Sequence, residues 1–244
     1  MHSSSRWGLG AAFALALGVA PAFADVVFTD TTFNLANYSF SPQATSPAGT
    51  LSITSSSGVL QTTATFTNSA TAINVAQGLV NNGFSYNPLT QGAITGIDTS
   101  VLKNISTDFT LTGGGNTFRP TVEQGGVFYL AAIAGATFNG PNAPGGTGFT
   151  NFSATGLQAT DFLSYDFSTG TFGSANPNFA GGGTLLFGLT QISGVGSFSG
   201  SPGQLITQYQ DLSFDIHAVP EPSTLLLFGA TLLGLGWLYR RRRV

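Results

Sequence analysis

Short stretches of strict polar–apolar alternation, separated by turn-forming residues, constrain this chain more than any other feature. Residues 210–218 (QDLSFDIHA) place Leu212, Phe214 and Ile216 on one face, opposite Asp211, Ser213, Asp215 and His217. Residues 105–112 (ISTDFTLT) and 162–169 (FLSYDFST) alternate in the same way, with Leu163, Tyr165 and Phe167 sharing a face in the second. A period of two is that of a β-strand with one buried face. These stretches therefore predict strands.

Glycine, asparagine and proline clusters punctuate the chain between these stretches, as at 46–49, 81–83 and 181–183, and they predict turns. Residues 127–136 and 184–192 are almost continuously apolar and predict central strands. We expect one short helix, at residues 70–80. Many short strands with such turns are typical of an all-β, two-sheet antiparallel sandwich, with a jelly-roll or lectin-like arrangement as our first choice. We assign residues 25–218 to one such exported domain.

Charged residues make up only 7% of the chain. From Asp25 to Asp215 the cations Lys103 and Arg119 stand against nine acids, which gives this region a net charge of −7. Nucleic-acid binding needs many cations facing phosphates, so that class is excluded. There is no cysteine, which excludes disulfides, thiolate metal sites and a cysteine nucleophile.

The first 24 residues have the organisation of a secretory signal peptide. Arg6 gives a positive start, residues 9–19 are apolar, and Ala22-Phe23-Ala24 forms the small-x-small site that signal peptidase accepts. We predict cleavage between Ala24 and Asp25, so that the mature protein is exported.

The chain ends in an apolar segment followed by a basic cluster. Residues 225–239 are uncharged, and Arg240, Arg241, Arg242 and Arg243 follow them. With Ser223, Thr224 and snorkelling arginines, the segment approaches the minimum length of a membrane span, and the arginines favour a cytoplasmic end. We predict a transmembrane helix at about 224–239 that anchors the protein in the inner membrane.

Residues 219–244 resemble the PEP-CTERM sorting signal of Gram-negative bacteria. Pro220, Glu221 and Pro222 stand where that family carries its recognition motif, and the apolar helix and arginine cluster follow in the same order. The resemblance implies recognition by a membrane-embedded exosortase, processing near the motif, release to the cell surface, and an association with exopolysaccharide and biofilm. A plain tail anchor is the alternative.

Nothing in the sequence forms a recognisable catalytic set. Once residues 1–24 are removed, His217 is the only histidine, and we expect it to be a solvated residue at the end of a strand. A single histidine at the end of a strand is not enough for a serine triad or for a histidine-rich zinc site. Asp211 and Asp215 on one strand face would lie about 13 Å apart, too far for a glycosidase pair. We therefore predict no enzyme activity.

Small ligands leave weaker signals. We assign no cofactor and no firm metal site; structural calcium is the better small-ion candidate, with Asp161, Asp166, Asp211 and Asp215 as candidate ligands. Sugar stacking would need an exposed ring, for which Tyr38, Tyr86, Tyr129 and Tyr209 are candidates. The sequence thus predicts an exported, exosortase-sorted protein with a structural or adhesive role in extracellular polysaccharide. A lectin-like carbohydrate-binding protein is the alternative, and a glycoside hydrolase or lyase is the second alternative.

Overall fold

A computed structural model describes residues 25–45, 48–107, 115–131, 137–139, 146–197, 199, 201–219, 229 and 232. The predicted signal peptide lies outside these residues. The Pro-Glu-Pro motif and the arginine cluster lie outside them as well. Only Gly229 and Leu232 of the predicted transmembrane helix are described, so that helix stays a prediction.

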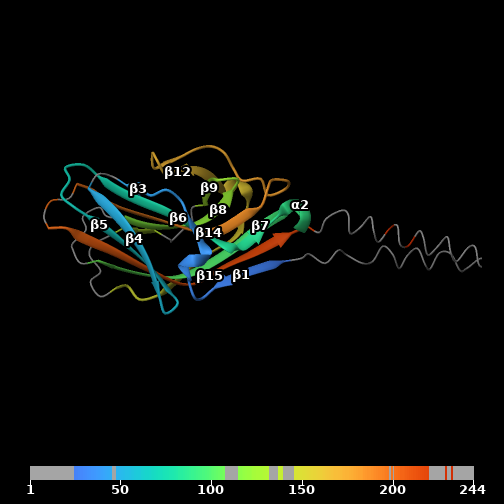
Figure 1. The fold of residues 1–244 in the computed structure, drawn as a ribbon, viewed down its shortest axis with the longest axis horizontal. Coiled ribbons are helices and arrows are strands. Elements are labelled where there is room, and N and C mark those ends of the chain that lie inside the picture. Colours follow the sequence, from blue (N-terminus) through green and yellow to red (C-terminus); the bar gives the residue numbers. More distant parts are fainter. Residues whose placement is uncertain are drawn as a thin grey trace, which may run out of the picture.

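The described residues form two antiparallel sheets, which confirms the predicted two-sheet sandwich (Figure 1). Sheet A has the order β11 (Thr150–Leu157), β7 (Ile94–Thr107), β15 (Gly203–Ala218), β5 (Val59–Phe66) and β4 (Gly49–Ser56), with β1 (Val26–Asp30) also paired to β15. Sheet B has the order β13 (Thr171–Phe172), β12 (Phe162–Asp166), β9 (Val127–Ala131), β8 (Gly115–Gln124), β14 (Leu185–Val195), β6 (Ile73–Tyr86) and β2 (Tyr38–Phe40), with β3 (Ala44–Thr45) on β6 and β10 (Thr137–Asn139) on β8. Three short helices complete the described elements: η1 (Leu35–Asn37), α2 (Pro88–Gln91) and η2 (Ala159–Asp161).

The core between the sheets is built from aromatic and aliphatic side chains. Phe187 of β14 and Phe214 of β15 lie on opposite sheets with ring centroids 5.5 Å apart. Phe84 contacts the same group, 6.4 Å from Phe214 in an edge-on arrangement. Offset and edge-on ring contacts of this kind stabilise a core beyond the burial of apolar area alone. These three phenylalanines therefore help to join the two sheets.

Strand β15 is the middle strand of sheet A and shows the predicted alternation. Leu212, Phe214 and Ile216 are fully buried, as expected for one face. The register shifts between Gln210 and Ser213, and Asp211 takes a left-handed backbone with φ of 53°. Such a bulge adds one residue to the strand and changes which positions point inward. It lies where the neighbour of β15 changes from β5, which pairs with residues 203–209, to β1, which pairs with residues 212–216.

Two local predictions are wrong. Residues 70–80 do not form a helix: Ile73–Tyr86 is strand β6, which pairs along most of its length with β14. Short apolar runs do not separate helix from strand by periodicity, and tertiary pairing decides the outcome here. In β12, Leu163 is exposed while Tyr165 and Phe167 are buried, so the three do not share one buried face. The predicted central strand at 184–192 is confirmed as β14, which lies between β6 and β8.

Sheet B requires a very close approach between β14 and β6 at one glycine. A Cβ atom at Gly188 would lie 1.9 Å from the carbonyl oxygen of Leu79. Real Cβ atoms do not occupy such positions, so only glycine fits there.

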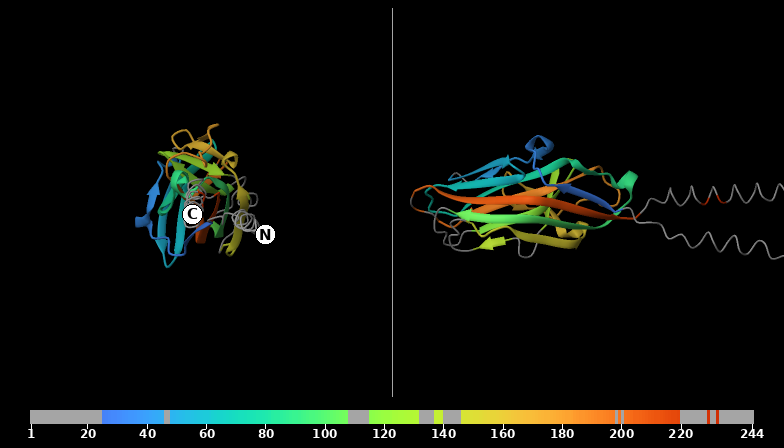
Figure 2. Two further views of the ribbon diagram at one scale, coloured as in Figure 1. Left: turned by 90° about the vertical axis from the view of Figure 1, so that its right-hand side faces the viewer. Right: turned by 90° about the horizontal axis from the view of Figure 1, so that it is seen from below.

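The first and last strands of the sandwich are neighbours. Val26 pairs with Ile216 and Asp30 with Leu212, so β1 begins where β15 ends. Figures 1 and 2 show the start of β1 and the end of β15 together at one end of the elongated sandwich. We call this the exit end, and it is defined by Asp25, α2, Ala93 and residues 217–219.

Candidate functional site

The fold continues up to the residue before the Pro-Glu-Pro motif. Ala218 is fully buried and pairs with Ile94 of β7. The N–H group of Val219 donates a hydrogen bond to the carbonyl of Ala93, at 2.9 Å. Ala93 follows directly after α2 and its C-cap Gly92. The last described residues before the motif are therefore held by the sandwich.

A histidine and three carboxylates lie on the outer face of sheet A at the exit end. His217 Nδ1 is 3.2 Å from Asp25 Oδ1, and His217 Nε2 is 3.3 Å from Asp98 Oδ2. Asp25 directly precedes β1, and Asp98 belongs to β7, which flanks β15 on its other side. Hydrogen bonds that the imidazole donates to Asp25 and to Asp98 raise the pKa of His217 above its ordinary value, and the charge of Asp215 adds to this effect. We call Asp25, Asp98, Asp215 and His217 the exit cluster.

His217 lies next to the end of β15 with 35% of its side chain exposed, in line with the sequence prediction. The prediction missed its partners, because both of its ring nitrogens have an acidic neighbour. The pairing of β1 and β7 with β15 produces this arrangement, because it places residues far apart in sequence side by side. A hydrophobic pattern within one strand carries no signal of such a contact.

Asp215 is the one predicted calcium ligand that belongs to the exit cluster. Ligand atoms of Asp25, Asp215 and His217 lie within 4.8 Å of one another, and Asp215 Oδ1 is buried without a hydrogen-bond partner. Two carboxylates and an imidazole suit zinc and related metals better than calcium, which prefers oxygen ligands throughout.

The other three predicted calcium ligands lie outside the exit cluster. Asp161 accepts the Gln158 N–H at the start of η2, Asp166 accepts from the N–H and hydroxyl of Ser168, and Asp211 is the bulge residue of β15. The four carboxylates are spread over three elements, and calcium binding by them stays a prediction.

The geometry of His217 is unsuited to nucleophilic catalysis. A catalytic histidine needs one ring nitrogen to receive a proton from the nucleophile while a carboxylate orients the other. Here both nitrogens face carboxylates. In a glycosidase the space between two carboxyl groups holds substrate and water, whereas here the imidazole ring lies between Asp25 and Asp98.

The tyrosines expected as sugar-stacking rings lie in the interior. Tyr38, Tyr86, Tyr129 and Tyr209 are at most 9% exposed. The Tyr38 hydroxyl donates to Asp30, the Tyr86 hydroxyl to the carbonyls of Gln91 and Gly92, and the Tyr209 hydroxyl to Gln191. The four rings pack in the core, and the hydroxyls of Tyr38, Tyr86 and Tyr209 donate to interior acceptors. The prediction that these tyrosines could form an exposed stacking surface is therefore wrong.

Among the residues that the structure describes, the exposed aromatic rings are phenylalanines. Phe40, Phe149 and Phe172 are 40–43% exposed. The guanidinium of Arg119 lies 4.9 Å from the centroid of the Phe172 ring, and Tyr165 contacts that ring edge-on at 4.9 Å. An exposed ring backed by an arginine is one arrangement on which a sugar can stack.

A buried carboxylate stabilises the region where β1 turns into η1. Asp30 Oδ1 accepts the N–H groups of Thr32 and Phe33, and Asp30 Oδ2 accepts the Tyr38 hydroxyl and the Asn81 amide. Burial raises the pKa of Asp30, but the hydrogen bonds from Phe33, Thr32 and Tyr38 together outweigh it, and the pKa lies below its ordinary value. Asp30 and Asn81 also line a shallow hollow beside β1. The hydrogen bond from the Asn81 amide to Asp30 gives both residues a structural role.

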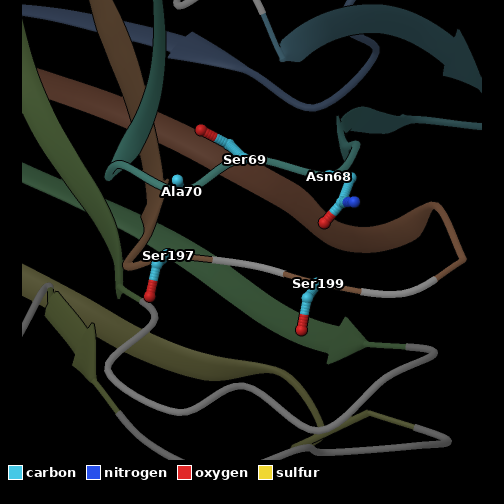
Figure 3. A pocket seen from close by; sticks show the side chains of 5 residues that line it. All are labelled: Asn68, Ser69, Ala70, Ser197 and Ser199. Atoms are coloured by element: carbon cyan, nitrogen blue, oxygen red, sulfur yellow. The ribbon is translucent and has the colours of Figure 1, made fainter.

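Figure 3 shows a second hollow, of about 440 Å³. It lies at the end of the sandwich opposite the exit end, beside the loop that leads into Gly203, where β15 begins. It is lined by Asn68, Ser69 and Ala70, from the loop between β5 and β6, and by Ser197 and Ser199, from the loop between β14 and β15. Ligand pockets of this size are ordinarily lined by apolar and aromatic groups. The described residues that line this hollow offer hydroxyls, one amide and a methyl group, so they form a neutral polar surface.

Comparison with known proteins identifies the C-terminal segment. The family model of the PEP-CTERM protein-sorting motif matches residues 218–243. The protein is thus a β-sandwich that carries a PEP-CTERM sorting motif at its C-terminus, as the sequence predicted. This motif implies processing by an exosortase and an exported, cell-surface protein. Among the described residues, no helix is long and apolar enough to cross a membrane.

The sandwich itself has only distant likenesses. A protein of unknown function from Shewanella oneidensis MR-1 is 12% identical, with a TM-score of 0.34, over 89% of this chain and 97% of that chain. A carbohydrate-binding module that specifically recognises mannan is also 12% identical, with a TM-score of 0.32, over 81% of this chain and 97% of that one. No curated protein matches the sequence. Likenesses at this level define no function.

Proposed function

We propose that the protein is a non-enzymatic, structural or adhesive component of an extracellular polysaccharide matrix, delivered to the cell surface by exosortase processing. The observation that carries this proposal is the direct junction at the exit end. The sandwich extends up to Val219, and Pro-Glu-Pro begins at the next residue, within the matched segment 218–243. A folded domain joined so directly to a sorting signal is a passenger that the signal delivers. Anchoring in the inner membrane before processing belongs to the same proposal.

The surface chemistry supports a role among neutral sugars. The end opposite the exit end offers serine and asparagine side chains, which can exchange hydrogen bonds with sugar hydroxyls. The acidic excess of the domain keeps it soluble in a hydrated matrix. The absence of enzyme activity is part of the proposal, and it is supported by His217, whose two nitrogens both face carboxylates.

A lectin-like carbohydrate-binding role is the second candidate, with a jelly-roll arrangement of the strands. Phe172 favours it, because its ring is 43% exposed and backed by Arg119. Discrete sugar recognition would require this ring, whereas a structural role in the matrix would not.

The test follows the full chain in a host that contains an exosortase. The wild-type protein and a variant with Pro220, Glu221 and Pro222 replaced by alanine are compared for size and for distribution among membrane, matrix and medium. We expect the wild type to be shortened and retained in the matrix, and the variant to stay full-length in the membrane. Identical behaviour of the two would show that the motif is incidental and that the segment is a plain anchor.

A second measurement separates the two candidate roles. Binding of the wild type and of Phe172→Ala to a glycan array is compared, with Phe40→Ala as the control at a similarly exposed ring. Saturable, sugar-competed binding that Phe172→Ala alone abolishes would replace the structural role with the lectin-like one.

A further inference from the structure

We propose that the exit end of the sandwich is a docking surface for the membrane-embedded enzyme that processes the sorting motif. The inference rests on the exosortase processing described above and adds a part of the substrate outside the motif. The motif match begins at Ala218, which is fully buried within β15. The recognised segment and the folded domain therefore overlap, and no linker separates them.

Because so few residues separate the motif from the domain, an enzyme that binds the motif must contact the domain. An extended chain advances at most about 3.6 Å per residue, so Pro222 lies within about 11 Å of Val219 in any conformation. A single helix with its side chains is about 10–12 Å across. Any active site that closes around Pro220–Pro222 therefore has its wall in contact with the residues around Val219.

Detaching the end of β15 would be the way to avoid this contact, and the structure opposes it. Ile216 is fully buried and is paired on one side with Val26 and on the other with Ile97. His217 is held between Asp25 and Asp98 by its two ring nitrogens. Pulling residues 216–218 free would break both ladders and open the core at Ile216, so the enzyme meets a folded end.

The surface at this end defines the chemistry of its partner. Leu89 of α2 is 59% exposed and Val219 is 43% exposed, and the hydrogen bond from Val219 to Ala93 joins the two segments. Figure 1 shows α2 beside the end of β15. The exit cluster adds three carboxylates against one histidine on the sheet A side. The surface is thus an apolar rim next to an acidic patch, and it fits a partner surface with apolar and basic side chains.

The test compares processing of full-length variants in a host that contains an exosortase. Leu89→Glu places a charge on the apolar rim at an exposed position. Phe149→Glu is the matched control, because Phe149 is also exposed but lies away from the exit end. It adjoins Thr150, which pairs with Lys103, and Lys103 is nine residues along β7 from Ile94 at the exit end. We expect Leu89→Glu to slow the appearance of the shortened form at least fivefold, and Phe149→Glu to leave the rate unchanged. Protease resistance of each exported variant verifies that it is folded.

A ten-residue Gly/Ser insertion between Val219 and Pro220 makes the test specific for docking. With this linker the motif is reached without contact with the exit end, so Leu89→Glu should no longer alter the rate. Equal processing of Leu89→Glu and wild type at the native spacing would overturn the proposal. It would equally be overturned if the insertion alone accelerated processing while Leu89→Glu had no effect, because the end face would then be only an obstacle.

The remaining outcomes separate the partner from the membrane and from the proposed function. If Leu89→Glu lowered membrane association in a host without exosortase and left processing unchanged with it, the surface would contact lipid and the proposal would be wrong. Failure of the wild type to be shortened at all would refute the processing itself, and docking with it. If the wild type is shortened normally and only Leu89→Glu is shortened slowly, exosortase processing stands and docking is confirmed.

Discussion

Asp30 is the residue whose removal should destabilise the sandwich most clearly. Replacing it by alanine removes the acceptor carboxylate of three buried donors: the Phe33 N–H, the Tyr38 hydroxyl and the Asn81 amide. Each unsatisfied buried donor costs about 1–3 kcal/mol, and water entering from the adjacent hollow recovers part of that. We expect the free energy of unfolding of Asp30→Ala to fall by about 3–5 kcal/mol.

The measurement is urea unfolding of residues 25–219, followed by circular dichroism. At an m-value of about 2 kcal/mol per molar urea, the midpoint should fall by roughly 2 M. Asp161→Ala is the control, since Asp161 is exposed and accepts a single backbone hydrogen bond, from Gln158, and its midpoint should move far less. A shift for Asp30→Ala no larger than that of the control would refute the reasoning.

The pKa of Asp30 gives the same prediction a pH signature. A carboxyl group whose pKa is lower in the folded state contributes stability above its unfolded pKa, near 3.8, and loses it as the pH falls through the lower folded value. The Asp30→Asn variant has no titratable group at position 30. The difference in stability between wild type and Asp30→Asn should therefore be constant at neutral pH and shrink below about pH 4. A difference that stays constant down to pH 2 would contradict the role assigned to the carboxylate.

Three further predictions concern single positions. Gly188→Ala should lower the free energy of unfolding by about 3 kcal/mol or more, or prevent folding, because its Cβ would meet a backbone carbonyl oxygen. Gly181→Ala is the control: its Cβ would meet nothing within 4 Å, so it should unfold like wild type in the same urea assay. His217 should titrate above pH 6.5 in an NMR experiment, and Asp98→Asn should lower that pKa; an unchanged titration would show that the pair is not formed in solution. Burial lowers the pKa of Lys103 to about 7, so the unfolded chain binds more protons between pH 7 and 10, and wild-type stability should rise with pH across this range. Lys103→Met should abolish that rise, and a rise that persists would refute the assignment.

The strands that could be predicted are those whose burial pattern is set locally. In β15 the alternation of Leu212, Phe214 and Ile216 with polar residues follows directly from one buried face. The bulge at Asp211 carries no such signal, because an aspartate in a left-handed conformation is not marked in the sequence. Strand β6 was missed for a related reason: both faces of residues 73–80 are largely buried, and alternation disappears when a strand is covered on both sides.

The candidate site could be predicted only where it is contiguous in sequence. The Pro-Glu-Pro motif and its flanking segments are read from one stretch of chain. The exit cluster joins Asp25 and His217, which are 192 residues apart, through the pairing of β1 with β15. Neither residue has a neighbour in sequence that reveals the other. The four tyrosines illustrate the same limit, because residue type alone does not tell whether a ring faces the core or the solvent.

The pairing of β1 with β15 also sets the order in which the sandwich can be completed. β15 is the middle strand of sheet A, and β1 finds its described strand partner only there. A chain made from its N-terminus cannot finish this sheet until residues 203–218 have emerged, and closing such long loops makes folding slow. The sorting motif follows β15 without a gap. Strand β15 therefore both completes sheet A and presents the sorting motif. A molecule whose exit end is folded is thus one in which sheet A is complete.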